Sequence, residues 1–150
     1  MTPRNPRGFV NARVDAAGRL KLPAKYQEFL KALSDRNLFA TMYEGMARIY
    51  SNGSFERNLS LLADQPDLYE TMAKFGDMFG SDVDVDPQGR ITIPQNLRKL
   101  LGLENTSVYL RFDDDVISVY SEGQYQVEEA RLQAKIAEAL QAAKAKGFRL

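Results

Sequence analysis

The chain has 150 residues, of which 44% are hydrophobic and 27% are charged, and its 20 basic residues balance its 20 acidic residues. It contains neither cysteine nor histidine, which excludes disulfide frameworks and the usual zinc sites and removes the commonest general base. No apolar run reaches the roughly 18 residues of a transmembrane helix, and the first residues lack the apolar core of a secretory signal. These features indicate a globular cytoplasmic protein and weigh against an enzyme.

A ten-residue phrase occurs twice in the chain, at Val14–Pro23 and again at Val85–Pro94. Val, Asp, Gly, Arg and Pro recur in register, and the two leucines of the first copy become isoleucines in the second. Such dense self-similarity is typical of a duplicated structural unit. We therefore interpret the chain as two fused copies of one unit.

The first unit begins with a strand over Phe9–Val14. A turn follows, in which Asp15 closes the backbone through its side chain and Gly18 accepts a positive φ. The remaining expected elements of this unit are a strand over Leu20–Leu22, a helix begun by Pro23, and a hairpin of Leu38–Tyr43 and Ala47–Ser51 around Glu44-Gly45.

The second unit repeats this order. Its turn spans 86–89, and Gly102 fits the C-terminal cap of its helix. The expected elements are strands Val83–Val85 and Ile91–Ile93, a helix begun by Pro94, and a hairpin of Ser107–Phe112 and Val116–Tyr120 around Asp113-Asp114-Asp115.

A helical segment follows each unit. Between the units, the second of two helices begins at Pro66, and after the second unit a helix extends from Glu122 to about Lys146. The expected divisions are a first repeat at 7–53, a helical connector at 54–80, a second repeat at 81–121 and a C-terminal amphipathic helix at 122–150. A narrow apolar stripe on the last helix favours packing on its own barrel or on a neighbouring subunit; the stripe contains Tyr125, Leu132, Ile136, Leu140 and Ala143.

One unit alone would leave too many strand edges unpaired to be stable. Two units can close each other's edges in a single barrel. The sequence therefore predicts an α+β, β-rich fold: a pseudo-twofold β-barrel made of two ββαββ repeats, with helical appendices after each repeat. The two Gly-Arg turns should occupy equivalent places in it.

Positive charge is concentrated at the start of the chain. Residues 1–25 carry six basic side chains against the single acidic Asp15: Arg4, Arg7, Arg13, Arg19, Lys21 and Lys25. Arginine offers a rigid fork of donors that suits phosphate and the edge of guanine, so this cluster favours a DNA-facing surface around the first turn. Two other interpretations stay open: a solvated basic terminus, and a purely structural turn in which Arg19 and Arg90 pair with nearby carboxylates.

The duplicated Asp-x-x-Gly-Arg-x-x-x-Pro phrase resembles the MraZ family, within the wider group of AbrB-like, double-psi-like swapped-hairpin barrels. The resemblance covers about residues 7–121 and includes Arg7-Gly8, Asp15–Tyr26, Ile49-Tyr50-Ser51, Asp86–Pro94, Leu97-Arg98 and Gly102-Leu103. Two copies in one chain with intervening helices are more specific than a single copy, which would also suit an AbrB-type antitoxin.

The resemblance implies a bacterial transcriptional regulator of the division and cell-wall gene cluster. Such proteins form homo-oligomeric rings and bind direct repeats in their own promoter as double-stranded DNA. It also implies that the motif arginine contacts DNA, a role that transfers to Arg19 and to its counterpart Arg90. We expect a nucleoid-associated, non-catalytic protein without cofactor, metal, membrane or small-molecule substrate, whose DNA-binding residues are Arg19, Arg7, Arg13, Lys21, Lys25 and Arg90.

Two other classes of function are compatible with the residues. One is a protein-interaction module whose barrel and C-terminal helix bind or inhibit a partner without DNA. The other is a hydrolase that uses the carboxylates of Asp113, Asp114 and Asp115, although a solvated hairpin turn is the simpler explanation of these aspartates, since no other candidate residue converges there in the sequence.

Overall fold

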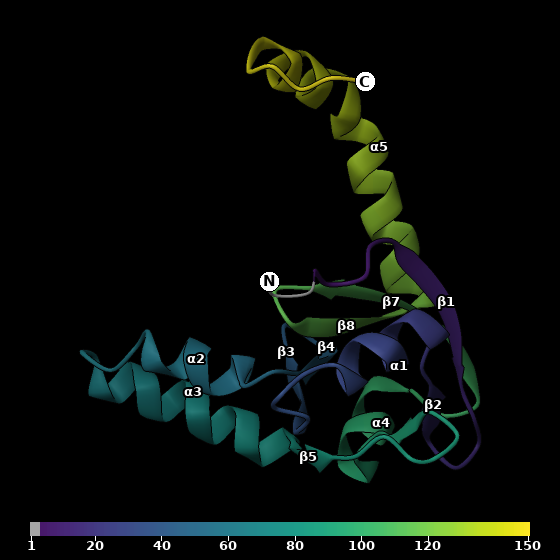
Figure 1. The fold of residues 1–150 in the computed structure, drawn as a ribbon, viewed down its shortest axis with the longest axis vertical. Helices are drawn as coiled ribbons and strands as arrows, with labels where there is room; N and C mark the ends of the chain where they lie inside the picture. The colour runs from purple at the N-terminus through teal and green to yellow at the C-terminus, as the bar shows by residue number, and fades with distance from the viewer. Residues whose placement is uncertain (1–3) are drawn as a thin grey trace.

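The computed structural model describes residues 4–150 and contains one antiparallel sheet of eight strands that curls into a nearly closed barrel (Figure 1). The first repeat contains β1 (Phe9–Val14), β2 (Arg19–Lys21), α1 (Ala24–Lys31), β3 (Leu38–Tyr43) and β4 (Met46–Tyr50). The second repeat contains β5 (Ser81–Val83), β6 (Arg90–Thr92), α4 (Gln95–Leu101), β7 (Thr106–Asp113) and β8 (Val116–Ser121). The α+β class and the ββαββ order are confirmed.

Within residues 4–150, three helices lie outside the two repeats. The connector forms α2 (Ser54–Ser60) and α3 (Pro66–Phe79), and β8 leads directly into α5 (Glu122–Ala145). A capping box begins α5: the backbone amide of Gln124 donates to Ser121 Oγ at 3.1 Å, and the Gln124 side chain accepts from the Ser121 amide. Within the described part of the chain, no helix combines the length and apolar character needed to cross a membrane.

The strand order shows that the two repeats exchange hairpins. It is β5-β3-β4-β8-β7-β1-β2-β6. The first strand of each repeat pairs with the third strand of the other, as β1 with β7 and β5 with β3. The second strands pair with each other, as do the fourth strands. This is a pseudo-twofold swapped-hairpin barrel, as predicted.

Some boundaries differ from the expected ones. The strand expected at Val83–Val85 ends at Val83, and beyond it only an isolated bridge joins Val85 to Ile91. Pro23 and Pro94, expected as first helical residues, instead occupy the N-cap positions with extended ψ values of 148° and 138°. Each proline therefore fixes the bend between a strand and its helix.

The repeated apolar positions fill the barrel. Leu20 and Leu22 of the first copy and Ile91 and Ile93 of the second are 0–1% exposed. Burying one such side chain stabilises a fold by roughly 1.5–3 kcal/mol. Among the residues that the structure describes, the other large side chains that are fully enclosed are Val14, Tyr26, Ile49, Leu97, Val108, Leu110, Ile117 and Val119.

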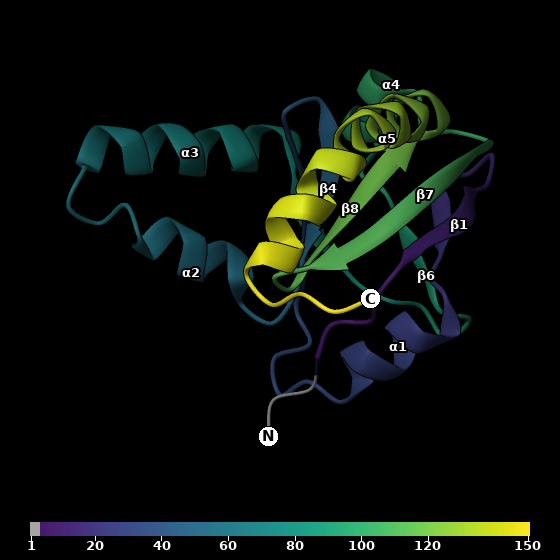
Figure 2. The same cartoon turned by 90° about the horizontal axis from the view of Figure 1, so that it is seen from above.

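The α2–α3 hairpin and α5 extend away from the barrel in different directions (Figures 1 and 2). Two hydrogen bonds attach α3 to β3: Thr41 Oγ1 donates to the Gly76 carbonyl, and the Tyr43 hydroxyl donates to the Met72 carbonyl, both at 2.7 Å. The α5 helix is attached near its first turns, where Tyr125 stacks on Tyr109 with ring centroids 3.9 Å apart.

Candidate nucleic-acid interface

The two copies of the repeated phrase meet on one two-stranded ribbon. Strands β2 and β6 pair antiparallel, so that Arg19 lies opposite Thr92 and Lys21 lies opposite Arg90. Because side chains alternate between the faces of a strand, the buried Leu20 and Ile91 point into the barrel and these four residues lie on the outer face. The fold therefore gathers cations from both repeats on one surface.

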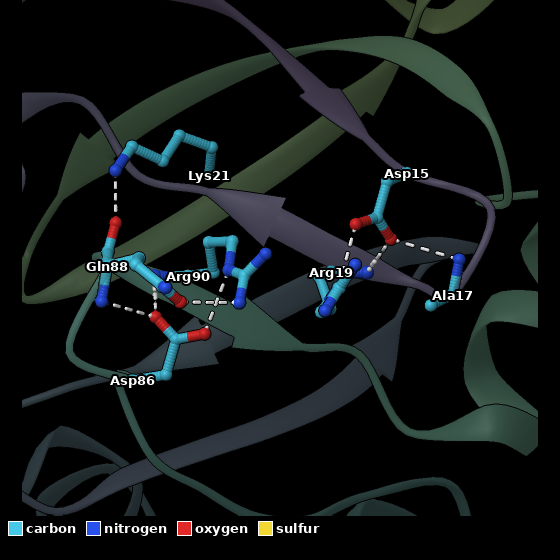
Figure 3. Close-up of polar contacts among 7 residues, drawn as sticks. All are labelled: Asp15, Ala17, Arg19, Lys21, Asp86, Gln88 and Arg90. Atoms are coloured by element: carbon cyan, nitrogen blue, oxygen red, sulfur yellow. Dashed lines mark hydrogen bonds and ion pairs between the residues drawn. The ribbon is translucent and has the colours of Figure 1, made fainter.

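The first turn is closed by the carboxylate of Asp15 (Figure 3). Its Oδ1 accepts from the backbone amides of Arg19 at 2.8 Å and Ala17 at 3.0 Å. Its Oδ2 accepts from Arg19 Nε at 2.8 Å. One carboxylate thus shapes the turn and also orients the guanidinium that follows it.

The second turn repeats this geometry. Asp86 accepts from the backbone amides of Arg90 and Gln88 and from Arg90 Nε, each at 2.9 Å (Figure 3). In both turns the backbone amide of the arginine, helped by its guanidinium, holds the pKa of the aspartate below its usual value of 3.8. Both carboxylates are therefore ionised at neutral pH.

Each motif arginine pairs with the aspartate of its own turn, as a purely structural role of the turns would require. This pairing nevertheless leaves part of each guanidinium available to another partner. Within the guanidinium of Arg19, Asp15 engages only Nε, and no hydrogen bond within residues 4–150 involves the Nη nitrogens of that side chain. Arg90 is held more firmly, because its Nη2 also donates to Gln88 Oε1 at 2.6 Å. The side chain of Arg19 is 41% exposed, against 27% for Arg90.

The other four expected site residues are all exposed. Lys21 Nζ donates to the backbone carbonyl of Gln88, next to Arg90. Lys25, at the start of α1, donates to the carbonyl of Arg7 at 2.7 Å, so these two residues lie together. Arg13 lies on β1, where its Nη2 donates to Asn105 Oδ1 at 2.7 Å.

Two further residues support the turns. Arg98 on α4 crosses the first turn against Gly18 and donates to the Ile93 carbonyl at 2.9 Å. Gln27 on α1 crosses the second turn against Gly89 and donates to the Leu22 carbonyl at 2.8 Å. Each turn is therefore supported by a side chain from the helix of the other repeat. These contacts were not predicted from the sequence, although the offset that relates the two copies of the phrase also relates Gln27 to Arg98.

The three aspartates of the β7–β8 turn have a structural setting. Asp114 and Asp115 adopt positive φ values of 50° and 62°, as a tight two-residue hairpin requires. The Asp115 carboxylate accepts from Asn5 at 3.1 Å and forms an ion pair with Arg57 at 2.9 Å. This carboxylate thereby ties the chain before β1 and the start of α2 to the turn.

Comparison with known proteins places the chain in a family. Residues 78–147 match a family model described as "MraZ protein, putative antitoxin-like". The transcriptional regulator MraZ of Acidobacterium capsulatum is 36% identical over 97 residues, which span 62% of this chain and 66% of the relative. Its namesake in Koribacter versatilis is 32% identical over 111 residues, or 71% of this chain and 76% of the relative. The chain therefore belongs to the MraZ family.

Proposed function

We propose that this protein is a non-catalytic transcriptional regulator that binds double-stranded DNA through the β2–β6 ribbon. The observation that carries the proposal is the pairing of β2 with β6, which places Arg19, Lys21 and Arg90 on one exposed face. Relatives that carry the name transcriptional regulator support the assignment.

A two-stranded ribbon has the dimensions that the major groove admits, since the groove is about 12 Å wide. The Nη nitrogens of Arg19, which no residue among 4–150 engages, suit the two acceptors of a guanine edge or a phosphate. Lys21 and Arg90 lie on the same face. We propose that Arg13, on the neighbouring strand β1, and the adjacent Arg7 and Lys25 contact the phosphate backbone. In this assignment Arg19 is the principal base-reading residue.

Each subunit offers few cations, so a single subunit would bind DNA weakly. We propose that the protein assembles into a homo-oligomeric ring whose ribbons engage direct repeats in its own promoter, upstream of division and cell-wall genes. Once one subunit is bound, the others bind at a high effective concentration, which raises affinity without new contacts. The protein would then act in the cytoplasm, on the nucleoid.

The test measures binding of the full chain to its own upstream DNA by fluorescence anisotropy at several salt concentrations. Arg19→Ala should weaken specific binding by about 1–3 kcal/mol, the value of one bidentate base contact. Arg131→Ala is the matched control, because it removes an exposed arginine from α5, away from the ribbon. Equal affinities of the two variants would refute the role of Arg19.

A steep fall of affinity with salt is expected, because phosphate neutralisation releases counterions. Light scattering on the same variants shows whether assembly is intact, and this separates a lost DNA contact from a lost oligomer. Binding that is insensitive to salt and to Arg19→Ala would point to a function without DNA.

A further inference from the structure

The far part of α5 and the residues after it carry apolar side chains that no other part of residues 4–150 covers. No residue of α5 is buried. Ile136 is 48% exposed, Phe148 60% and Leu150 85%. Figure 1 shows this part of the helix standing clear of the barrel.

The end of this helix is nevertheless closed by a regular pattern of backbone hydrogen bonds. Gly147 has a φ of +98°, and its amide donates to the Lys144 carbonyl at 2.9 Å. The Phe148 amide donates to the Ala143 carbonyl at 3.0 Å. These two bonds form a Schellman cap, which folds the chain back on the helix and fixes the place of Phe148. The backbone of an aromatic residue is thus fixed at the exposed end of the helix.

The α2–α3 hairpin presents a second uncovered apolar surface. Leu61 is 76% exposed, Met78 68% and Leu68 41%. The outer face of α3 carries a groove of about 520 Å³, and the residues that line it are Ala63, Pro66, Tyr69, Glu70, Ala73 and Lys74. Its small and aromatic lining residues suit an apolar side chain, and the two charged residues that also line it, Glu70 and Lys74, pair with each other.

The two surfaces carry opposite charge. The hairpin, residues 54–79, has five acidic side chains against Arg57 and Lys74, and the acidic ones are Glu56, Asp64, Asp67, Glu70 and Asp77. The tip, residues 136–150, has three basic side chains against Glu138, and the basic ones are Lys144, Lys146 and Arg149. Apolar patches flanked by opposite charges are complementary, and like-charged patches disfavour each other.

We propose that the tip of α5, residues 136–150, docks on the α2–α3 hairpin of a second copy of this chain, with Phe148 facing the groove of α3. Within one molecule the two surfaces extend in different directions (Figures 1 and 2), so contact between them requires a second copy. Two tips placed side by side would instead bring Lys144 and Lys146 against each other.

A contact between two different surfaces of the same protein is heterologous. It continues from copy to copy and closes into a ring when the rotation allows. The inference therefore rests on the homo-oligomeric assembly proposed above and names the surfaces that build it. It does not depend on DNA binding, so the two proposals can fail separately.

The first experiment measures the mass of the full-length protein by light scattering. Lys144→Glu, Lys146→Glu and Arg149→Glu together should reduce the assembly to single chains, and so should Asp64→Lys, Asp67→Lys and Asp77→Lys together. A chain with both sets of reversals restores opposite charges and should assemble again, which controls for misfolding. If both charge-reversed variants still assemble, the proposed interface is wrong, whereas the proposal that the protein forms a homo-oligomer is unaffected.

The second experiment uses the absence of cysteine from the chain. Ala73→Cys and Leu150→Cys are prepared as separate full-length proteins, mixed and oxidised. A disulfide between the two different variants is the expected product. Homodimers of Leu150→Cys alone would instead support tip-to-tip pairing, and an assembled protein without any cross-link would place the interface elsewhere. Either result would overturn the proposal, as would a wild-type protein that stays a single chain at all concentrations.

Discussion

Lys21 and Arg90 lie directly opposite each other across the β2–β6 pair, although they belong to different repeats. Like charges in this arrangement destabilise an antiparallel pair. The cost is partly offset because Lys21 donates to the Gln88 carbonyl and Asp86 engages Arg90. The positive charges of Lys21 and Arg90 do not stabilise the folded chain. Their presence therefore favours a role in binding an anion outside the protein.

Lys21→Thr tests this argument, because the second repeat has Thr92 at the equivalent position. We expect the free energy of unfolding to stay unchanged or to rise by about 0.2–1 kcal/mol, the usual size of a cross-strand effect. DNA affinity should fall, and the plot of log affinity against log salt should become shallower by about 0.9 per lost phosphate contact. Urea unfolding and anisotropy titrations measure the two quantities. A loss of stability without loss of affinity would assign Lys21 a structural role.

The two motif arginines should not contribute equally. Arg90 is less exposed than Arg19 and donates to Gln88 as well as to Asp86. We therefore expect Arg90→Ala to reduce DNA affinity less than Arg19→Ala in the same anisotropy assay. Gln88→Ala releases Arg90 from one acceptor and should leave affinity unchanged or slightly raise it. Equal losses for both arginine variants would show that the ribbon binds DNA symmetrically.

Much of this fold can be predicted from the sequence because duplication repeats local signals. The Asp-x-x-Gly-Arg phrase fixes both turns, and the alternating apolar residues around Leu20 and Ile91 fix the inward face. The pairing of β2 with β6 depends on contacts between residues about 70 positions apart, and neither propensity nor periodicity encodes such contacts. For the same reason, the contact of Arg98 with the first turn and that of Gln27 with the second turn can be recognised only in the folded structure.

Gly18 should be far more sensitive to substitution than another glycine with positive φ. Its φ is +80°, and a Cβ there would overlap the Arg98 side chain. Gly45 has a φ of +70° and no neighbour within 4 Å of the place of a Cβ. Gly45→Ala should cost about 1–2 kcal/mol, the penalty of the left-handed conformation alone. Gly18→Ala should cost more, measured by urea unfolding, and should also displace Arg98 and weaken DNA binding. Equal costs would mean that Arg98 moves aside freely.

The turn aspartates should make stability depend on pH in the acidic range. Because the folded pKa values of Asp15 and Asp86 lie below 3.8, the ionised carboxylates stabilise the folded chain above the unfolded pKa, which is about 3.9. This contribution is lost as pH falls through the folded pKa values. Asp15→Asn with Asp86→Asn removes the two charges while keeping an oxygen that can accept from the backbone.

We expect the wild-type chain to be more stable than this double variant from pH 7 down to about 5, with a constant difference. Below the unfolded pKa the difference should shrink, and it should vanish once both carboxylates are protonated. Urea unfolding at a series of pH values measures it, and subtracting the two curves removes the contribution of the other acidic residues. A difference that stays constant down to the acid limit would show that the carboxylates act through shape and not through charge, and the oriented guanidinium of Arg19 would then need another explanation.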